Sequence, residues 1–283
     1  MPTFRYVLVT LLCSVLSFIP AFAHGQEQGA QALVQSIVTN ELKVDANDHS
    51  LWMFRDQNKA HGKSTVKLVV QTPQGEVSKT IEINGHALTP QQKQADKRKI
   101  HRFITDPAVR RKQKQNQQQD DKKAASLTRM LPEAFLWAIT GEHGDETTLA
   151  FKPNPKFNPP TREARVFAAM KGTMVVNTRQ KRIKSLKGTL IRNVEFGWGL
   201  LGKLEKGGTF NIERQNIGPG VWEITATHVH IQGHALIFKS ISEQQDEVTS
   251  DYKPSPPAIT LAEAAKMLID GTVAKDIGAA QAR

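Results

Sequence analysis

The sequence predicts an α+β protein in which helices cover the apolar face of a strongly curved antiparallel sheet. The main observation is the region 166–241, which reads as consecutive β-strands joined by short turns rich in Gly and Lys. Hydrophobic side chains there fall on alternate positions: Leu186, Leu190, Val194, Phe196 and Trp198. Successive side chains of a strand point to opposite faces, so one face of this sheet is apolar and needs a cover. Helical patterns before and after the region can supply that cover.

The N-terminal part predicts one helix and three strands. Helical spacing of i, i+3, i+4, i+7 and i+8 relates Ala30, Leu33, Val34, Ile37 and Val38. Strands are expected at 51–56, 65–72 and 77–83, because β-branched and aromatic residues alternate there with polar ones. Pro73-Gln74-Gly75 has the composition of a hairpin turn, and Asn84-Gly85 ends the third strand.

Residues 89–140 have no strand pattern and predict a helical segment. Thr89 can cap a helix that has Pro90 at its first position, and Asp106-Pro107 repeats this start signal. Residues 110–123 contain almost no apolar residue and predict either a solvated helix or a disordered loop. A second apolar stripe follows, formed by Leu127, Met130, Leu131, Phe135 and Ile139. The helix is therefore expected to continue through Phe135.

The C-terminal half predicts an antiparallel meander followed by a linker and a helix. Strands are expected at 147–151, 164–170, 173–178, 183–196, 208–214, 221–231 and 235–242. Short links between consecutive strands favour antiparallel neighbours. Residues 254–257 form a Pro-rich linker, and Thr260 with Glu263 forms a capping box for a helix that ends at Gly271.

The first residues read as an export signal. Arg5 precedes an apolar run at 7–19, and Ala21-Phe22-Ala23 is a cleavage site, so residues 1–23 are expected to be removed and the protein to be periplasmic. A retained N-terminal anchor is the alternative. The single cysteine, Cys13, lies inside this signal, which excludes disulfides and thiolate sites from the mature chain. The formal net charge of +11 favours encounters with anionic partners.

Three clusters could carry chemistry, and each has a simpler interpretation. The run 197–202 matches G-x-G-x-x-G, but a further turn and strand follow it, which favours a bend in the sheet over a nucleotide site. His228, His230 and His234 lack a nearby carboxylate at ligand spacing, which favours partly exposed histidines over a metal site. The charged turn at 142–146, with Glu142, His143, Asp145 and Glu146, is more typical of a solvated loop than of a catalytic pair. The sequence therefore predicts no metal, no cofactor and no catalytic residue.

Two further features concern partners. The segment 93–123 carries eleven Lys or Arg residues against four Asp, with Phe103 as its only aromatic residue. Nucleic-acid binding would favour several stacking aromatics, so an anionic membrane surface is the more accessible partner, and a solvated basic helix is the simplest interpretation. Arg192 interrupts the alternating pattern and is either a candidate latch at a cavity rim or a strand-end residue that reaches water.

The order of these elements resembles the periplasmic lipoprotein-carrier and lipoprotein-sorting family. The resemblance rests on layout: an export signal, an amphipathic helix, early strands, Asn84-Gly85 leading into a helix, Phe135-Leu136-Trp137, and a long meander that carries Trp222. It covers residues 30–253. It implies a half-open β-barrel whose concave face holds acyl chains under a helical lid. The basic insert 110–123 and the C-terminal helix depart from the family pattern.

We therefore expect a carrier of lipid or lipoprotein acyl chains, a monomer that does no covalent chemistry. Residues 24–253 would form the half-barrel domain, with 89–140 as its lid, and 254–283 would form a C-terminal linker and helix. The candidate lipid-binding residues are Trp52, Phe54, Leu68, Val70, Ile81, Ile83, Leu131, Phe135, Leu190, Val194, Phe196 and Trp222. The first alternative is an envelope adaptor that docks on anionic membrane or polymer through 93–123. The second is a hydrolase, which would require the 142–146 and 228–234 clusters to meet in one pocket.

Overall fold

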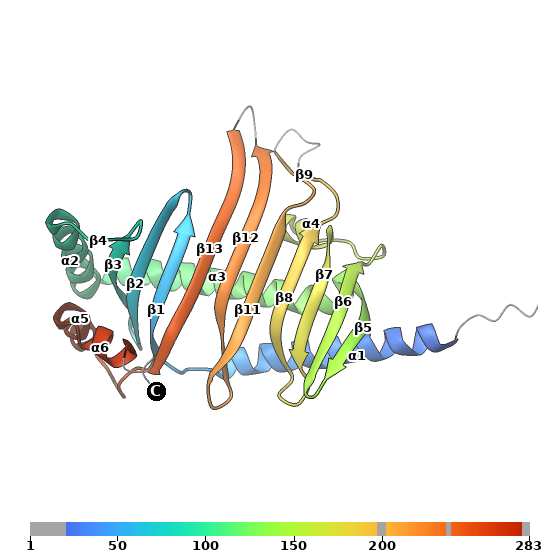
Figure 1. The fold of residues 1–283 in the computed structure, drawn as a ribbon, viewed down its shortest axis with the longest axis horizontal. Coiled ribbons are helices and arrows are strands. Elements are labelled where there is room, and N and C mark those ends of the chain that lie inside the picture. Colours follow the sequence, from blue (N-terminus) through green and yellow to red (C-terminus); the bar gives the residue numbers. More distant parts are fainter. Residues whose placement is uncertain (1–20, 197–201, 236–238, 279–283) are drawn as a thin grey trace, which may run out of the picture.

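The computed structural model describes residues 21–196, 202–235 and 239–278 (Figure 1). The helices are α1 (Ala21–Asn47), α2 (Pro90–Thr105), α3 (Pro107–Ala134), α4 (Arg162–Phe167), α5 (Leu261–Asp270) and α6 (Thr272–Gly278). The strands are β1 (Trp52–Ala60), β2 (Lys63–Thr72), β3 (Gly75–Ile83), β4 (His86–Ala87), β5 (Phe135–His143), β6 (Glu146–Pro153), β7 (Met170–Asn177), β8 (Arg182–Leu190), β9 (Val194–Phe196), β10 (Gly202–Leu204), β11 (Thr209–Gly218), β12 (Val221–Ala235) and β13 (Lys239–Pro254).

All the strands belong to one curved antiparallel sheet. Their order is β4-β3-β2-β1-β13-β12-β11-β8-β7-β6-β5, and β10 adds β9 to the side of β12. The predicted α+β class and antiparallel arrangement are therefore confirmed. The sheet does not close, because β4 and β5 lie at its two ends (Figure 1). The N-terminal hairpins join the meander through the last strand, since β1 pairs with β13.

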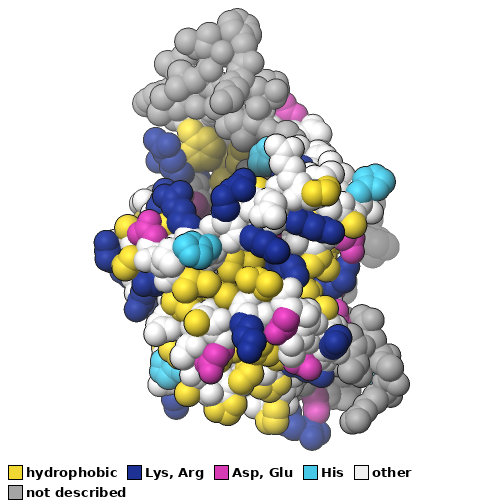
Figure 2. Space-filling model, turned by 90° about the vertical axis from the view of Figure 1, so that its left-hand side faces the viewer, with side chains coloured by type: hydrophobic (Ala, Val, Ile, Leu, Met, Phe, Trp, Pro, Cys, Tyr) yellow, Lys and Arg dark blue, Asp and Glu magenta, His cyan; other side chains and the backbone are white. Residues whose placement is uncertain are grey.

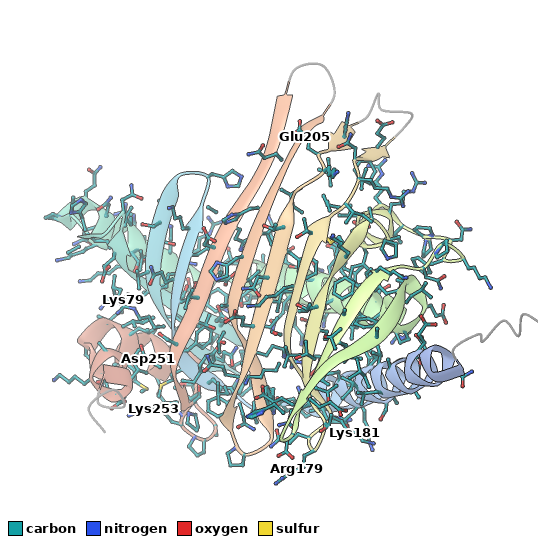
Figure 3. The ribbon with its side chains drawn as sticks, turned by 45° about the vertical axis from the view of Figure 1, so that its right-hand side comes forward. Lys79, Arg179, Lys181, Glu205, Asp251 and Lys253 are labelled. Atoms are coloured by element: carbon teal, nitrogen blue, oxygen red, sulfur yellow. The ribbon has the colours of Figure 1, made fainter. Side chains whose placement is uncertain are left out.

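Two hydrophobic cores lie on opposite faces of the sheet. On one face, here called the inner face, α1 and the end of α3 pack on β5–β8 around Phe135, Leu149 and Met174. On the other, the outer face, α5 and α6 pack on β1–β3 around Leu68, Val70 and Leu268. Lys79 of β3 donates a hydrogen bond of 2.7 Å to the carbonyl of Leu268, at the end of α5 (Figure 3).

Several local start and stop signals are confirmed. Thr89 and Thr260 each form the capping box at the start of a helix, and Asp106 caps α3. Helix α5 ends at Gly271, whose φ of 85° places it in the left-handed region that glycine adopts without strain. The basic segment 110–123 is helical, as part of α3.

The helix was predicted to continue through Phe135, and this was wrong. Helix α3 ends at Ala134, and β5 begins at Phe135. Phe135 and Trp137 are buried, while Leu136 between them is 39% exposed. Three adjacent apolar residues suggested burial on all sides, but they alternate as a strand does.

Two predicted strands also need correction. The segment 164–170 contains the end of α4, because Thr161 caps a helix there by accepting a hydrogen bond from the Ala164 N–H at 3.1 Å. The predicted strand 183–196 is broken between Leu190 and Val194, where the chain bends before the short β9. Arg192 lies in this bend, so it does not interrupt an apolar strand face.

Trp137 and Leu136 together test the strand assignment of β5. We expect Trp137→Ala to lower the free energy of unfolding by about 3–5 kcal/mol, because it empties a core position and removes the Nε1 donor of the Leu131 carbonyl. Leu136→Ala, the matched control, should change it by less than about 1 kcal/mol. Urea unfolding followed by fluorescence measures both; equal losses would contradict the alternation.

Candidate functional site

Helix α1 is fixed to the inner face by a buried ion cluster around Glu41. This carboxylate is 1% exposed and accepts hydrogen bonds from Arg182 Nε at 2.9 Å, Arg214 Nη1 at 2.7 Å and the Ile183 N–H at 2.5 Å. Arg182 belongs to β8 and Arg214 to β11, so one side chain of α1 is bonded to two strands. Moving α1 away from these donors would leave the Glu41 carboxylate and the two Arg side chains buried without partners, which is strongly destabilising.

A second contact holds the same end of the helix. Asn40 donates a hydrogen bond of 3.0 Å to the carbonyl of Lys181, in the turn between β7 and β8 (Figure 3). One residue in the sequence indicates that α1 docks on the sheet through a buried charge. Glu41 continues the apolar stripe of Val34 and Val38 at helical spacing, and a charge on such a stripe needs a buried partner.

The inner face changes from apolar to polar across the sheet. One row of paired residues begins with Leu149, Met174 and Leu186 on β6, β7 and β8. It continues through Ile212 and Thr227 on β11 and β12, and reaches Glu247 on β13 and Asn58 on β1. Helix α1 covers the apolar end of this row. Helix α1 does not reach the polar end, where Asn58 and Glu247 are half-buried.

Four apolar side chains lie at the boundary between these halves. This apolar group consists of Phe210 and Ile212 on β11 and Val229 and Ile231 on β12, all half-buried. The Phe210 ring lies over Gly188, where a Cβ atom would come within 2.3 Å of it. The group borders the inner core and keeps an accessible edge, so it offers apolar surface to a further contact.

Helix α3 crosses the inner face from one edge of the sheet to the other (Figure 1). At its start, Gln113 exchanges two hydrogen bonds of 3.0 Å with the backbone of Glu76 on β3. At its end, Leu131 and Ala134 join the core below α1 and β5. Every residue of 114–124 between these anchors is exposed. A helix packed on a sheet buries a residue every three or four positions, so this segment, which we call the strap, is not packed on the strands.

The polar half of the inner face carries an acidic group: Asp56 on β1, Glu76 on β3 and Glu247 on β13. Lys67 of β2 is paired with Asp56 at 3.2 Å. Burial, followed by the charge of Asp56, raises the pKa of Glu76 and also that of Glu247 above the ordinary carboxyl value. The three carboxylates therefore lie close enough to repel one another, with Lys67 as the cation beside them.

Three aromatic rings adjoin the acidic group. Phe54 stacks on Tyr252 with 5.1 Å between ring centroids, and Trp52 meets Tyr252 edge-on at 6.3 Å. Burial, together with the nearby charges of Glu247 and Asp56, raises the pKa of Tyr252 to about 12. Its phenol donates a hydrogen bond of 2.7 Å to Thr249 Oγ1 and stays neutral over the physiological range.

The structure separates the twelve residues predicted to line one cavity. Five of them lie in or against the inner core: Leu131, Phe135, Leu190, Val194 and Phe196. Three lie on the outer face against α5 and α6 or beside them: Leu68, Val70 and Ile81. Trp52 and Phe54 are at the polar end of the inner face. Ile83 pairs with Thr65 at the end of β3. Trp222 donates a hydrogen bond of 2.7 Å from its Nε1 atom to Gln180 Oε1. The sequence patterns do not reveal that both faces are covered.

The other candidate residues do not form a site together. Arg192 is exposed and donates to the Ala168 carbonyl at 3.3 Å, outside the inner face. His228 and His230 share Asp246 at 2.8 and 2.9 Å on the outer face. Three strands, β11, β8 and β7, lie between β12 and β6, where the β5–β6 turn carries Asp145. The two clusters that a hydrolase would need therefore do not meet.

The histidine and glycine motifs were the candidates for a metal site and a nucleotide site. Within the described ranges, no group of three or more His, Cys, Asp or Glu side chains is arranged to hold a metal ion. The glycine motif at 197–202 lies almost wholly outside the described residues, and so do residues 1–20 of the predicted signal 1–23.

Two cavities border the bulge in β13. One, of about 400 Å³, lies on the outer face between Arg55 and Ile277 of α6. The other, of about 510 Å³, lies where β12 and β13 part beyond the Ala226–Val248 pair. Asp251, which has a φ of 61°, lines both (Figure 3).

No family model matches this chain, and no curated protein or solved structure matches it either. Among the helices of the described ranges, none has the length and apolar character needed to cross a membrane.

Glu41 tests how α1 is held. We expect Glu41→Ala to lower the free energy of unfolding by about 3–5 kcal/mol, because it leaves Arg182 and Arg214 buried without their carboxylate. Asp45→Ala, one turn further along, should cost less, since Asp45 is more than half exposed. Denaturant unfolding compares the two; a loss for Glu41→Ala no larger than for Asp45→Ala would refute the docking role.

Proposed function

We propose that this protein is a periplasmic binder or carrier of an amphiphile, such as a lipid or the acyl chains of a lipoprotein. In this proposal the curved sheet acts as a half-open barrel, the apolar group receives the acyl chain, and α3 spans the opening. The observation that carries the proposal is the partly exposed apolar group on the inner face, which α3 crosses (Figure 1). No covalent chemistry is required of any residue.

The physical argument is one of incomplete cover. Helix α1 fills the inner face over β5–β8, while Ile212 and Val229 keep an accessible edge further along. An acyl chain placed there gains about 0.8 kcal/mol for each CH₂ group that leaves water. The resemblance to lipoprotein carriers inferred from the order of elements in the sequence, and the predicted export signal, favour the same function.

Val229 tests binding on the inner face. We expect the protein to bind a fluorescent fatty acid, and Val229→Gln to weaken this binding about tenfold, because it removes apolar contact from the apolar group. Val248→Gln on the same pair of strands is the control, since Val248 is 41% exposed and lies on the outer face. Fluorescence titration measures both, and native mass spectrometry of protein purified from membranes detects retained lipid. Absence of any bound lipid, together with no fatty-acid binding, would reject the proposal.

A second function is favoured by the direction of the basic side chains on α3. Gln113 faces the sheet edge, and helical geometry places Arg111, Lys122 and Arg129 on the opposite side. All three are exposed. The basic surface continues onto α2 with Lys93, Lys97 and Arg98, and Figure 2 shows Lys and Arg side chains gathered at this end of the molecule. This surface suits an adaptor that docks on an anionic membrane.

Vesicle binding tests the adaptor function. Replacing Arg111, Lys122 and Arg129 by Gln should weaken binding to phosphatidylglycerol vesicles about a hundredfold at low salt, at about 1 kcal/mol for each cation. The control replaces Lys59, Lys63 and Lys171, which are equally exposed but lie on strands. Co-sedimentation measures both. If the two triple variants lose the same affinity, binding depends on net charge alone and the stripe on α3 has no special role.

A further inference from the structure

We propose that the inner face holds a positively charged alkylammonium group, in a site formed by the acidic group and the Phe54–Tyr252 ring pair. The inference rests on the proposed function and names the class of its ligand: an amphiphile whose head carries a positive charge. The acyl chain would lie on the apolar group, and the head would lie on the strands beside it.

The first argument is an uncompensated buried charge. Asp56 is 8% exposed, and its Oδ2 atom is paired with Lys67 at 3.2 Å. Its Oδ1 atom is buried and has no hydrogen-bond partner among the described residues. An unsatisfied buried carboxylate oxygen costs free energy, so a bound cation would stabilise this atom.

The neighbouring carboxylates add to this charge. Asp56 raises the pKa of Glu76 and of Glu247, which places all three carboxylates around one region, with Lys67 lowering both pKa values in part. Gln71 and Gln245 provide hydrogen bonds to them but no charge. The region therefore holds three acids beside a single Lys, and a ligand cation would relieve their mutual repulsion.

The aromatic rings point to the kind of cation. Phe54 lies on the same face of β1 as Asp56, two residues away, and stacks on Tyr252. Ring faces attract ammonium groups within about 6 Å of the ring centroid, and alkylated ammonium groups, which are poor hydrogen-bond donors, depend on such rings. A site that combines carboxylates with aromatic ring faces is suited to bind an alkylammonium head.

The strap does not supply the missing cation. From Gln113, which faces the sheet, helical spacing brings Gln117, Asp120 and Ala124 toward the same side. Lys123 lies on the flank, where it pairs with Asp120 at 3.7 Å. The Lys and Arg residues of the strap fall on its flanks and its outer side, so its inward side is neutral or acidic.

The acidic group begins beside the apolar group. Val229 of the apolar group pairs with Gln245 on β13, and the next residue of β13 on this face is Glu247. Glu247 is the diagonal neighbour of Val229, at a distance of roughly 7–8 Å. Asp56 lies one strand further and pairs with Thr249, two residues beyond Glu247. An alkyl chain on the apolar group therefore reaches the acidic group first at Glu247.

Two probes with the same alkyl chain and opposite charges test the proposal. We expect dodecyltrimethylammonium to bind at least about tenfold more tightly than dodecyl sulfate, measured by calorimetry below their micelle concentrations. The net charge of +11 would attract dodecyl sulfate non-specifically, so the expected preference opposes the overall charge. Neutral dodecyl maltoside reports on chain binding alone.

Variants locate the preference. Glu76→Gln with Glu247→Gln should weaken dodecyltrimethylammonium binding about tenfold and leave dodecyl maltoside binding unchanged. Phe54→Leu should weaken the same cation while keeping a buried apolar side chain. Asp246→Asn, next to Glu247 but on the outer face, is the control and should have no effect. Equal or tighter binding of dodecyl sulfate, with dodecyl maltoside bound, would overturn the cation site alone. Failure of all three probes to bind would overturn the proposed function as well.

Discussion

The bonds from Glu41 to Arg182 and Arg214 determine how the inner face is divided. They bury one carboxylate of α1 between β8 and β11, and a carboxylate buried in this way cannot move without losing all its donors. The helix is thereby held over the apolar strands β5–β8, and its remaining apolar side chains complete that core. Helix α1 does not extend over the strands beyond β11, and α3 crosses the inner face there (Figure 1). An open, polar half of the sheet is thus a consequence of where one charged residue is bonded.

The two faces of the sheet differ in how tightly they are packed, because different helices cover them. On the outer face, α5 and α6 seal β1–β3 with small and branched side chains such as Ala264, Ala265 and Leu268. On the inner face, α3 is anchored only at its ends, by backbone bonds from Gln113 and by burial of Leu131. The first arrangement gives stability. The second leaves side chains of β11, β12 and β13 accessible, and the proposed binding depends on that accessibility.

Sequence patterns predicted the class, the antiparallel pairing and the helix caps, because each depends on neighbouring residues. Alternation marked the strands, and Thr89, Asp106 and Thr260 marked three helix starts. The patterns failed where a decision needed distant contacts. Phe135-Leu136-Trp137 fits a helix or a strand until its neighbours are known.

The prediction of the candidate site from the sequence failed for the same reason: it depends on contacts between residues far apart in the chain. Leu68 and Val69 are both buried although they point to opposite faces, so burial alone could not say which of them faces α5 on the outer face. Asp56, Glu76 and Glu247 come from three strands, and nothing local relates Glu247 to the other two. Glu41 was the one readable clue, as a charge on an apolar helical stripe.

The pairing of β1 with β13 also governs how the chain reaches this structure. It joins Trp52 to Pro254 and Ala60 to Gln245, so nearly the whole chain forms the loop that this pairing closes. Closing so long a loop carries an entropy cost that local contacts do not offset, and sheets with such distant pairings fold slowly. Until β13 arrives, the edges of β1 and β12 expose unpaired backbone groups that can join strands of other molecules. Newly made chains should therefore pass through an aggregation-prone intermediate, which gives a folding helper a reason to bind them.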